Sequence, residues 1–167
     1  MENFKQKLRN ISCFVFDLDG VLTDGTLLVT KEENYRRMNM RDGYALKSAA
    51  EAGYKIFVIS GGHTISVSDR LKYLKVTEYY QAVDDKVKVL KEVMKKHKLK
   101  PENILYMGDD IPDHEPMKLC GVPTCPVDAV PEIKSISIYV SDKKGGEGCA
   151  RDVIEQVMRL HGKWFKG

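Results

Sequence analysis

The chain has 167 residues, of which 43% are hydrophobic and 31% are charged, and its formal net charge at pH 7 is +3. A length and composition of this kind predict one globular domain covering residues 1–167. The net charge is too small to indicate a nucleic-acid partner, and no apolar run reaches the roughly 20 residues of a membrane-spanning helix. We therefore expect neither a nucleic acid nor a membrane as a partner.

The cysteines do not occur in the close pairs that metal sites and redox motifs use. They are Cys13, Cys120, Cys125 and Cys149. Cys13 lies in the first apolar run of the chain, where a side chain is expected to be buried. Buried free thiols are typical of a reducing compartment, and the sequence shows no signal-peptide pattern at its start. We expect a cytoplasmic protein.

Two carboxylates follow the first apolar run. A short helix is predicted at 4–9, and the run at 12–16 ends abruptly at Asp17-Leu18-Asp19-Gly20. An apolar run bounded by a turn is typical of a buried parallel strand, and chemistry in open α/β sheets lies beyond such strand ends. Because Asp17 and Asp19 are two residues apart, an extended chain places both carboxylates on one side. Together they need a cation or a shared proton.

A hairpin is predicted next, at about residues 25–40, where two β-like runs flank a polar turn. Asp42 is then expected as the N-cap of a helix at 43–52, with Gly53 as its C-terminal stop. The hairpin would therefore form a flap between the first strand and the first long helix.

In the rest of the chain, segments with the hydrophobic pattern of a strand alternate with segments that have the pattern of a helix. We predict strands at 54–59, 79–80, 104–107, 122–127 and 136–140, and helices at 64–74, 87–97, 114–119 and 149–160. In the helix at 64–74, the side chains expected to face inward are Ile65, Leu71 and Leu74. Strands that alternate with helices favour an α/β fold, with a doubly wound, Rossmann-like parallel sheet covered by helices on both faces.

Polar groups follow two further strands and open one helix. Ser60-Gly61-Gly62 ends the second strand, Lys86 precedes the helix at 87–97, and an acidic cluster at 108–113 ends the third strand. Taken singly, a Ser-Gly pair is usually a turn and a lone lysine is usually a solvated surface charge. Parallel strand ends meet at one edge of a sheet, so together these groups predict one site.

This ordered set of motifs resembles the haloacid dehalogenase superfamily of phosphatases. The resemblance implies that Asp17 is a nucleophile that forms an aspartyl-phosphate, and that Asp19 is the general acid and then the general base. It also implies a Mg²⁺ ion held by Asp17, Asp109 and the backbone carbonyl of Asp19.

The same resemblance assigns roles to the remaining polar residues. Lys86 is expected as a catalytic cation on the transferring phosphoryl group, whose oxygens would also bind Ser60 and the Gly61 amide. Asp110 and Asp113 are expected to orient the metal ligands or Lys86 without binding the metal directly.

A closer resemblance covers nearly the full chain. The segments DLDGVLTDG, NMRDGYAL, GDDIPD and GGEG occur in this order at 17–25, 39–46, 108–113 and 145–148. They are similar to those of the 3-deoxy-D-manno-octulosonate 8-phosphate phosphatases, enzymes of lipopolysaccharide sugar biosynthesis without a cap domain. The resemblance implies hydrolysis to the free sugar acid and phosphate. It also implies a homotetramer with active sites at subunit interfaces, covered by the hairpin.

The substrate is open at this point. A nine-carbon ulosonate 9-phosphate is the alternative, and a catalytically idle oligomerisation module is a further one. Family members often carry an arginine where this chain has Gly62, so another cation would have to meet the substrate carboxylate. Arg41 and Arg70 are the candidates, although either could equally be a salt-bridged surface residue.

Overall fold

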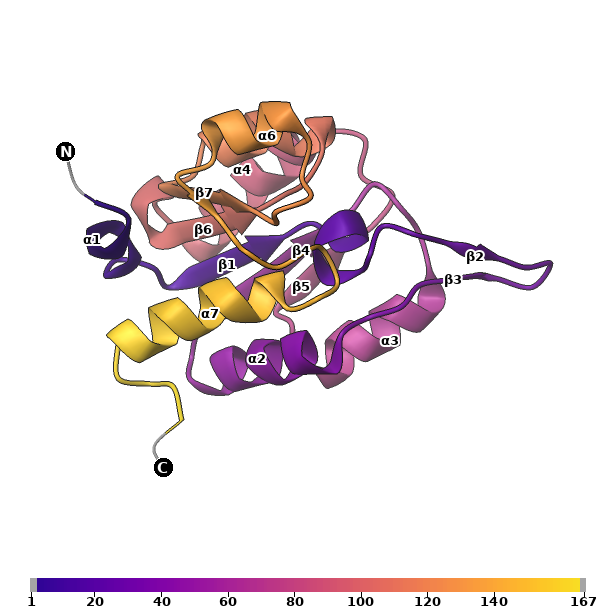
Figure 1. Cartoon of the computed structure of the whole chain (residues 1–167), viewed down its shortest axis with the longest axis horizontal. Coiled ribbons are helices and arrows are strands. Elements are labelled where there is room, and N and C mark those ends of the chain that lie inside the picture. The colour runs from indigo at the N-terminus through magenta and orange to yellow at the C-terminus, as the bar shows by residue number, and fades with distance from the viewer. Residues whose placement is uncertain (1–2, 166–167) are drawn as a thin grey trace.

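A six-stranded parallel sheet forms the centre of the molecule in this computed structural model, which describes residues 3–165 (Figure 1). The strands are β1 (Cys13–Phe16), β4 (Lys55–Ile59), β5 (Glu78–Tyr80), β6 (Ile104–Met107), β7 (Val122–Cys125) and β8 (Tyr139–Val140). Their order across the sheet is β5-β4-β1-β6-β7-β8, so β1 is central and β5 lies at an edge. The predicted doubly wound α/β fold is confirmed.

Helices cover both faces of this sheet. They are α1 (Phe4–Leu8), α2 (Met40–Glu51), α3 (Ile65–Tyr73), α4 (Lys86–His97), α5 (His114–Lys118), α6 (Pro131–Ile136) and α7 (Cys149–Leu160). Figure 1 shows α2, α3 and α7 on one side of the strands, with α4 and α6 on the other. No helix within residues 3–165 has the length and apolar character needed to cross a bilayer.

The central strand β1 is buried on both faces. Phe14 and Phe16 pack into the core beneath α2 and α7, whereas Cys13 and Val15 pack into the core beneath α4 and α5. All four side chains have no solvent exposure. Since alternate residues of a strand face opposite ways, a strand covered on both sides is continuously apolar, which is the pattern seen in the sequence.

The four cysteines are buried and form no disulfide, as predicted. Burial raises the pKa of the Cys120 thiol to about 12, and it also raises the pKa of Cys149. The thiols are therefore protonated at neutral pH and act as small apolar side chains.

The predicted hairpin is present as β2 (Leu28–Val29) and β3 (Asn34–Tyr35), which pair antiparallel and project beyond the sheet (Figure 1). Its turn is tied to α3 by Glu33. The Glu33 carboxylate accepts hydrogen bonds from the Thr64 hydroxyl at 2.9 Å and from the Ser66 amide at 3.3 Å. The hairpin is thus attached to the N-terminus of α3.

The prediction for Asp42 is wrong, because Asn39 caps α2 by accepting a hydrogen bond from the Arg41 amide at 2.8 Å. Asp42 lies in the first turn of α2 and is buried. Its carboxylate accepts from the amides of Gly148, at 3.2 Å, and Arg151, at 2.7 Å, at the start of α7. Burial raises the pKa of Asp42 to about 6, although these two amides oppose the shift. Asp42 therefore caps a distant helix instead of its own.

The inward orientation predicted for Ile65 is also wrong, because its side chain is 70% exposed. Val67 takes its place and is buried with Leu71 and Leu74, as those two were predicted to be. Positions 67, 71 and 74 follow the spacing of one helix face, whereas position 65 lies on the opposite side of α3.

The strand predicted at 136–140 is shorter than expected. Ile136 is the last residue of α6, a helix that the sequence analysis did not predict, and β8 covers only Tyr139–Val140. Pro131 is the first residue of α6, where a missing N–H costs nothing. The helix has only 6 residues, and two of them, Ile133 and Ile136, are β-branched, so its periodicity is too short to recognise.

Candidate active site

A pocket of about 520 Å³ lies beyond the carboxyl ends of β1, β4 and β6. It is lined by Asp17, Asp19, Gly25, Ser60, Gly61, Gly62, Val83, Asp84, Lys86, Asp109, Asp110 and Pro112. The motifs that the sequence separates by up to about ninety residues therefore meet at one edge of the sheet, as expected for parallel strands.

Asp17 directly follows β1 and lies at the base of this pocket. Its Oδ1 atom accepts a hydrogen bond from the Leu18 amide at 2.7 Å and lies 3.0 Å from the Lys86 ammonium. Burial raises the pKa of Asp17 well above its usual value, and the nearby Asp113 charge raises it further, while Lys86 opposes both. The carboxylate is therefore held in place, and a positive charge near it favours the ionised form.

Lys86 is the first residue of α4, and its side chain is only 5% exposed. Its Nζ atom also lies 2.8 Å from Asp113 Oδ1. Burial alone would lower the pKa of Lys86, but the carboxylates of Asp113 and Asp17 outweigh it and raise that pKa. The lysine therefore contributes a permanent positive charge beside Asp17.

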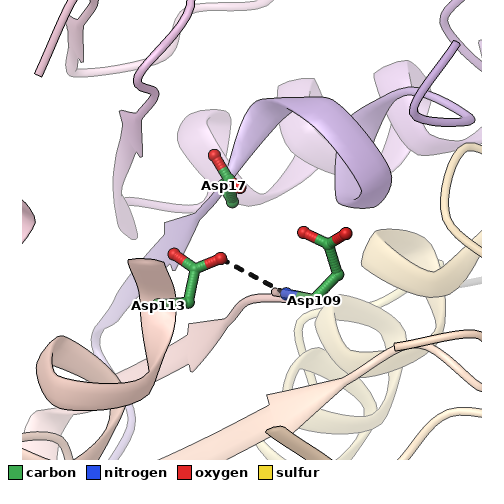
Figure 2. A group of neighbouring side chains, drawn as sticks. All are labelled: Asp17, Asp109 and Asp113. Carbon is green, nitrogen blue, oxygen red and sulfur yellow. Dashed lines mark hydrogen bonds between the residues drawn. The ribbon is translucent and has the colours of Figure 1, made fainter. Parts of the chain in front are cut away.

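Asp113 is completely buried behind these groups. Besides Lys86, its Oδ1 atom accepts from the Tyr106 hydroxyl at 2.9 Å, and its Oδ2 atom accepts from the Asp109 amide at 3.3 Å. Figure 2 shows this last bond joining the two ends of the acidic loop. Since both oxygens are engaged, Asp113 is placed to orient Lys86 and Asp109.

The carboxylates of Asp17, Asp109 and Asp113 are grouped so that one oxygen of each lies within 4.8 Å of the others (Figure 2). Asp109 Oδ1 is buried and has no hydrogen-bond partner among residues 3–165. Burial, together with the charges of Asp113 and Asp110, raises the pKa of Asp109 to about 7. A buried, unpaired carboxylate oxygen beside a second carboxylate fits a hard divalent cation such as Mg²⁺.

Glycine is required at two positions for these loops to approach. A Cβ atom on Gly20, where φ is +88°, would lie 2.0 Å from Asp109 Oδ2. A Cβ atom on Gly108 would lie 2.4 Å from the Cβ atom of Asp113. The glycines of the two motifs thus allow the acidic groups to come together.

The Asp19 carboxylate pairs with an arginine of the hairpin. Arg36 Nε lies 2.6 Å from Asp19 Oδ1, and Arg36 Nη2 lies 3.0 Å from Oδ2. The Thr23 hydroxyl donates a longer bond of 3.3 Å to Oδ1. Sequence reasoning missed Arg36, because it lies in a polar hairpin and belongs to no motif with a fixed spacing.

The Ser60 loop completes the pocket wall after β4. The Ser60 side chain is buried, and its hydroxyl accepts a hydrogen bond from the Gly62 amide at 3.1 Å. A Cβ atom on Gly62 would lie 2.7 Å from Arg36 Nη2. The space beside Gly62 is therefore occupied by the arginine of the hairpin.

The other predicted site residues lie in different places. Asp110 lines the pocket and accepts a hydrogen bond from the Ile111 amide at 2.7 Å. Arg41 lines a separate hollow beside α7. Arg70, on α3, has its guanidinium 5.4 Å from the centre of the Tyr73 ring, and its Nη2 atom lies 3.5 Å from Met40 Sδ on α2. Within the described chain, neither arginine lines the pocket, so their contact with a substrate stays a prediction.

Comparisons with known proteins agree with this geometry. Residues 42–127 match the family model of haloacid dehalogenase-like hydrolases. The 3-deoxy-D-manno-octulosonate 8-phosphate phosphatase KdsC of Escherichia coli K12 is 32% identical over 158 residues, which cover 94% of this chain and 84% of KdsC.

Solved structures show the same similarity. One is a crystal structure of 3-deoxy-D-manno-octulosonate 8-phosphate phosphatase from Moraxella catarrhalis, in complex with magnesium ion, phosphate ion and KDO. It superposes on this chain with a TM-score of 0.90 at 28% identity, and the match covers 93% of this chain and 90% of that one. The cobalt-bound phosphatase of Haemophilus influenzae gives a TM-score of 0.90 at 28% identity, covering 94% of this chain and 92% of that one. The chain therefore belongs to the haloacid dehalogenase-like hydrolases and, within them, to the family of 3-deoxy-D-manno-octulosonate 8-phosphate phosphatases.

Proposed function

We propose that this protein is a Mg²⁺-dependent phosphatase that hydrolyses a phosphate monoester through an aspartyl-phosphate. The observation that carries the proposal is the arrangement of Asp17, which lies in the pocket, 3.0 Å from Lys86 and within 4.8 Å of Asp109. Uncatalysed hydrolysis of phosphate monoesters is among the slowest reactions known, and a covalent intermediate divides it into two easier steps.

In the first step, an Asp17 oxygen attacks phosphorus while the bond from phosphorus to the substrate's alcohol oxygen breaks. Asp19 gives a proton to that oxygen, so the alcohol leaves neutral. In the second step, Asp19 takes a proton from water, whose oxygen attacks phosphorus and releases phosphate. Asp17 is then free again. One carboxyl group can serve both steps because the first step removes a proton from Asp19 and the second returns one to it from water.

Positive charge has to surround the transferring group, because a carboxylate and a phosphate dianion repel each other. Lys86 supplies one charge, and we propose that the Ser60 hydroxyl and the Gly61 amide bind the phosphoryl oxygens. Asp17, Asp109 and the backbone carbonyl of Asp19 would hold Mg²⁺, which neutralises charge on the phosphoryl oxygens when bound. Asp110 and Asp113 would keep these groups oriented.

For the substrate, we propose 3-deoxy-D-manno-octulosonate 8-phosphate, converted to the free sugar acid and phosphate in lipopolysaccharide sugar biosynthesis. The support is the family membership, together with the KDO, phosphate and magnesium ion named for the similar Moraxella catarrhalis structure.

Phosphate release from a panel of substrates tests the proposal. The panel contains the octulosonate 8-phosphate, a nine-carbon ulosonate 9-phosphate and glucose 6-phosphate, each with Mg²⁺, with Ca²⁺ or after chelation by EDTA. With Mg²⁺, we expect the octulosonate 8-phosphate to have the highest kcat/KM of the three substrates. We expect little turnover of it with Ca²⁺ and no turnover after chelation. A higher kcat/KM for the nine-carbon compound would support the alternative substrate. Full activity after exhaustive chelation would contradict the metal site, and no turnover of any phosphate would indicate an idle module.

We further propose a homotetramer of this single domain, in which a neighbouring subunit covers the hairpin flap at 25–40. The support is the exposure of apolar side chains on and beside the hairpin, with Leu28 67%, Val29 73% and Met40 73% exposed. Light scattering at assay concentration should give four times the mass of one chain. A fully active monomer would refute this assembly.

We also propose a cytoplasmic location, because the four free cysteines suit a reducing compartment. Cell fractionation that recovers the protein from an oxidising compartment would argue against it.

A further inference from the structure

We infer that Arg36 is a positioning residue for catalysis, which holds Asp19 where it can exchange a proton with the leaving group. This inference rests on the proposed function and adds to it a residue outside the four sequence motifs. It connects the hairpin to the chemistry, because Arg36 comes directly after β3.

The contact between the two side chains is a two-bond fork. Arg36 donates from Nε to Asp19 Oδ1 at 2.6 Å and from Nη2 to Oδ2 at 3.0 Å. Two parallel bonds fix the rotation of a carboxylate as well as its position, which a single lysine contact does not. The Asp19 side chain is therefore oriented by the hairpin.

The burial of Arg36 is unusual for a hairpin arginine. Its side chain is 5% exposed, whereas that of Arg37, the next residue, is 86% exposed and pairs with Asp24 at 2.9 Å. Arg36 Nη1 is also buried without a hydrogen-bond partner in the part of the chain that the structure describes. Burying a guanidinium with an unpaired nitrogen costs free energy, so stability alone does not favour this arrangement. We therefore connect its burial with function.

Gly62 leaves the room that this arrangement needs. A Cβ atom there would lie 2.7 Å from Arg36 Nη2 and 3.1 Å from Asp19 Oδ2. A side chain at position 62 and the fork between Arg36 and Asp19 therefore compete for the same space. This contact gives a way to displace Arg36 without replacing it.

Leaving-group dependence distinguishes this role from a structural one. An alkyl phosphate needs a proton on its departing oxygen, whereas p-nitrophenyl phosphate releases a stable anion without one. In single-turnover experiments with Mg²⁺, alcohol release from the alkyl phosphate by Arg36→Ala should fall about 100-fold, the range of general acid catalysis. Release of p-nitrophenolate should change less than about threefold, and Arg36→Lys should recover part of the loss.

Two further variants control for damage to the hairpin and the loop. Arg37→Ala removes the neighbouring, exposed ion pair of the same hairpin and should stay within about twofold of the unaltered protein on both substrates. Gly62→Ala should reproduce the selective loss on the alkyl phosphate, because its Cβ atom displaces Arg36.

Equal losses on the two substrates for Arg36→Ala and Gly62→Ala would overturn this inference and leave the phosphatase proposal intact. A selective loss in Arg37→Ala as large as in Arg36→Ala would also overturn it, by showing that any hairpin anchor has the same effect. No turnover by the unaltered chain would overturn both proposals together.

Discussion

Asp17→Asn should abolish turnover, by at least about four orders of magnitude, while leaving the fold intact. The amide cannot attack phosphorus, but it keeps the shape of the side chain, and its oxygen can still accept from the Leu18 amide and from Lys86. Burial already raises the pKa of Asp17, so the buried charge is costly and its removal should not lower the free energy of unfolding.

Phosphate release and urea unfolding measure the two halves of this prediction. Asp24→Asn is a matched control, because Asp24 lies in the same loop and pairs with Arg37 outside the pocket. We expect the control to keep activity within several-fold of the unaltered protein. Substantial steady-state turnover by a homogeneous Asp17→Asn preparation would rule out the aspartyl-phosphate mechanism.

Lys86→Met should impair both activity and stability. The change keeps the length of the side chain and removes its charge, which leaves the buried carboxylates of Asp17 and Asp113 without their cation. Breaking a buried ion pair in this way costs about 3–5 kcal/mol of unfolding free energy. Removal of the charge that we propose to face the phosphoryl oxygens should lower kcat by about 10²–10³-fold.

The same two measurements, with one added variant, separate these effects. Lys88→Met changes an exposed lysine on the same helix and should alter neither activity nor stability. Adding Asp113→Asn to Lys86→Met removes one unpaired carboxylate, so it should recover stability without recovering activity. If Lys86→Met unfolds at the same urea concentration as the unaltered protein, the charged network around Asp113 does not contribute to stability as proposed.

Several elements could be predicted because their signals are local. Cys13 to Phe16 are apolar at every position, which indicates a strand covered on both faces, and Lys86 stands where a helical pattern begins. The convergence of Asp17, Ser60 and Asp109 followed from one general rule, that the carboxyl ends of parallel strands meet at the same edge. The position of these groups was therefore predictable without any knowledge of side-chain contacts.

Other features depend on how distant segments pack. Asp42 has the composition of an N-cap, but its two amide partners belong to α7, 106 and 109 residues further along the chain. Ile65 is apolar and lies at the start of a helix, yet only the packing of α3 decides which of its sides is buried. The local propensities of Asp42 and Ile65 are compatible with both the predicted and the observed positions, so they could not distinguish the two.

By itself, the sequence determined the parallel α/β sheet, because its hydrophobic pattern follows the repeats of strands and helices. It also determined that four motifs meet at one edge, because parallel strands all end on the same side of the sheet. Only the tertiary structure decided that Arg36 pairs with Asp19, and that Arg41 and Arg70 lie outside the pocket. The hairpin has no core of its own, and its path depends on attachments such as that of Glu33 to α3. That attachment decides which charged side chain of the hairpin contacts Asp19, and no repeating pattern in the sequence encodes it.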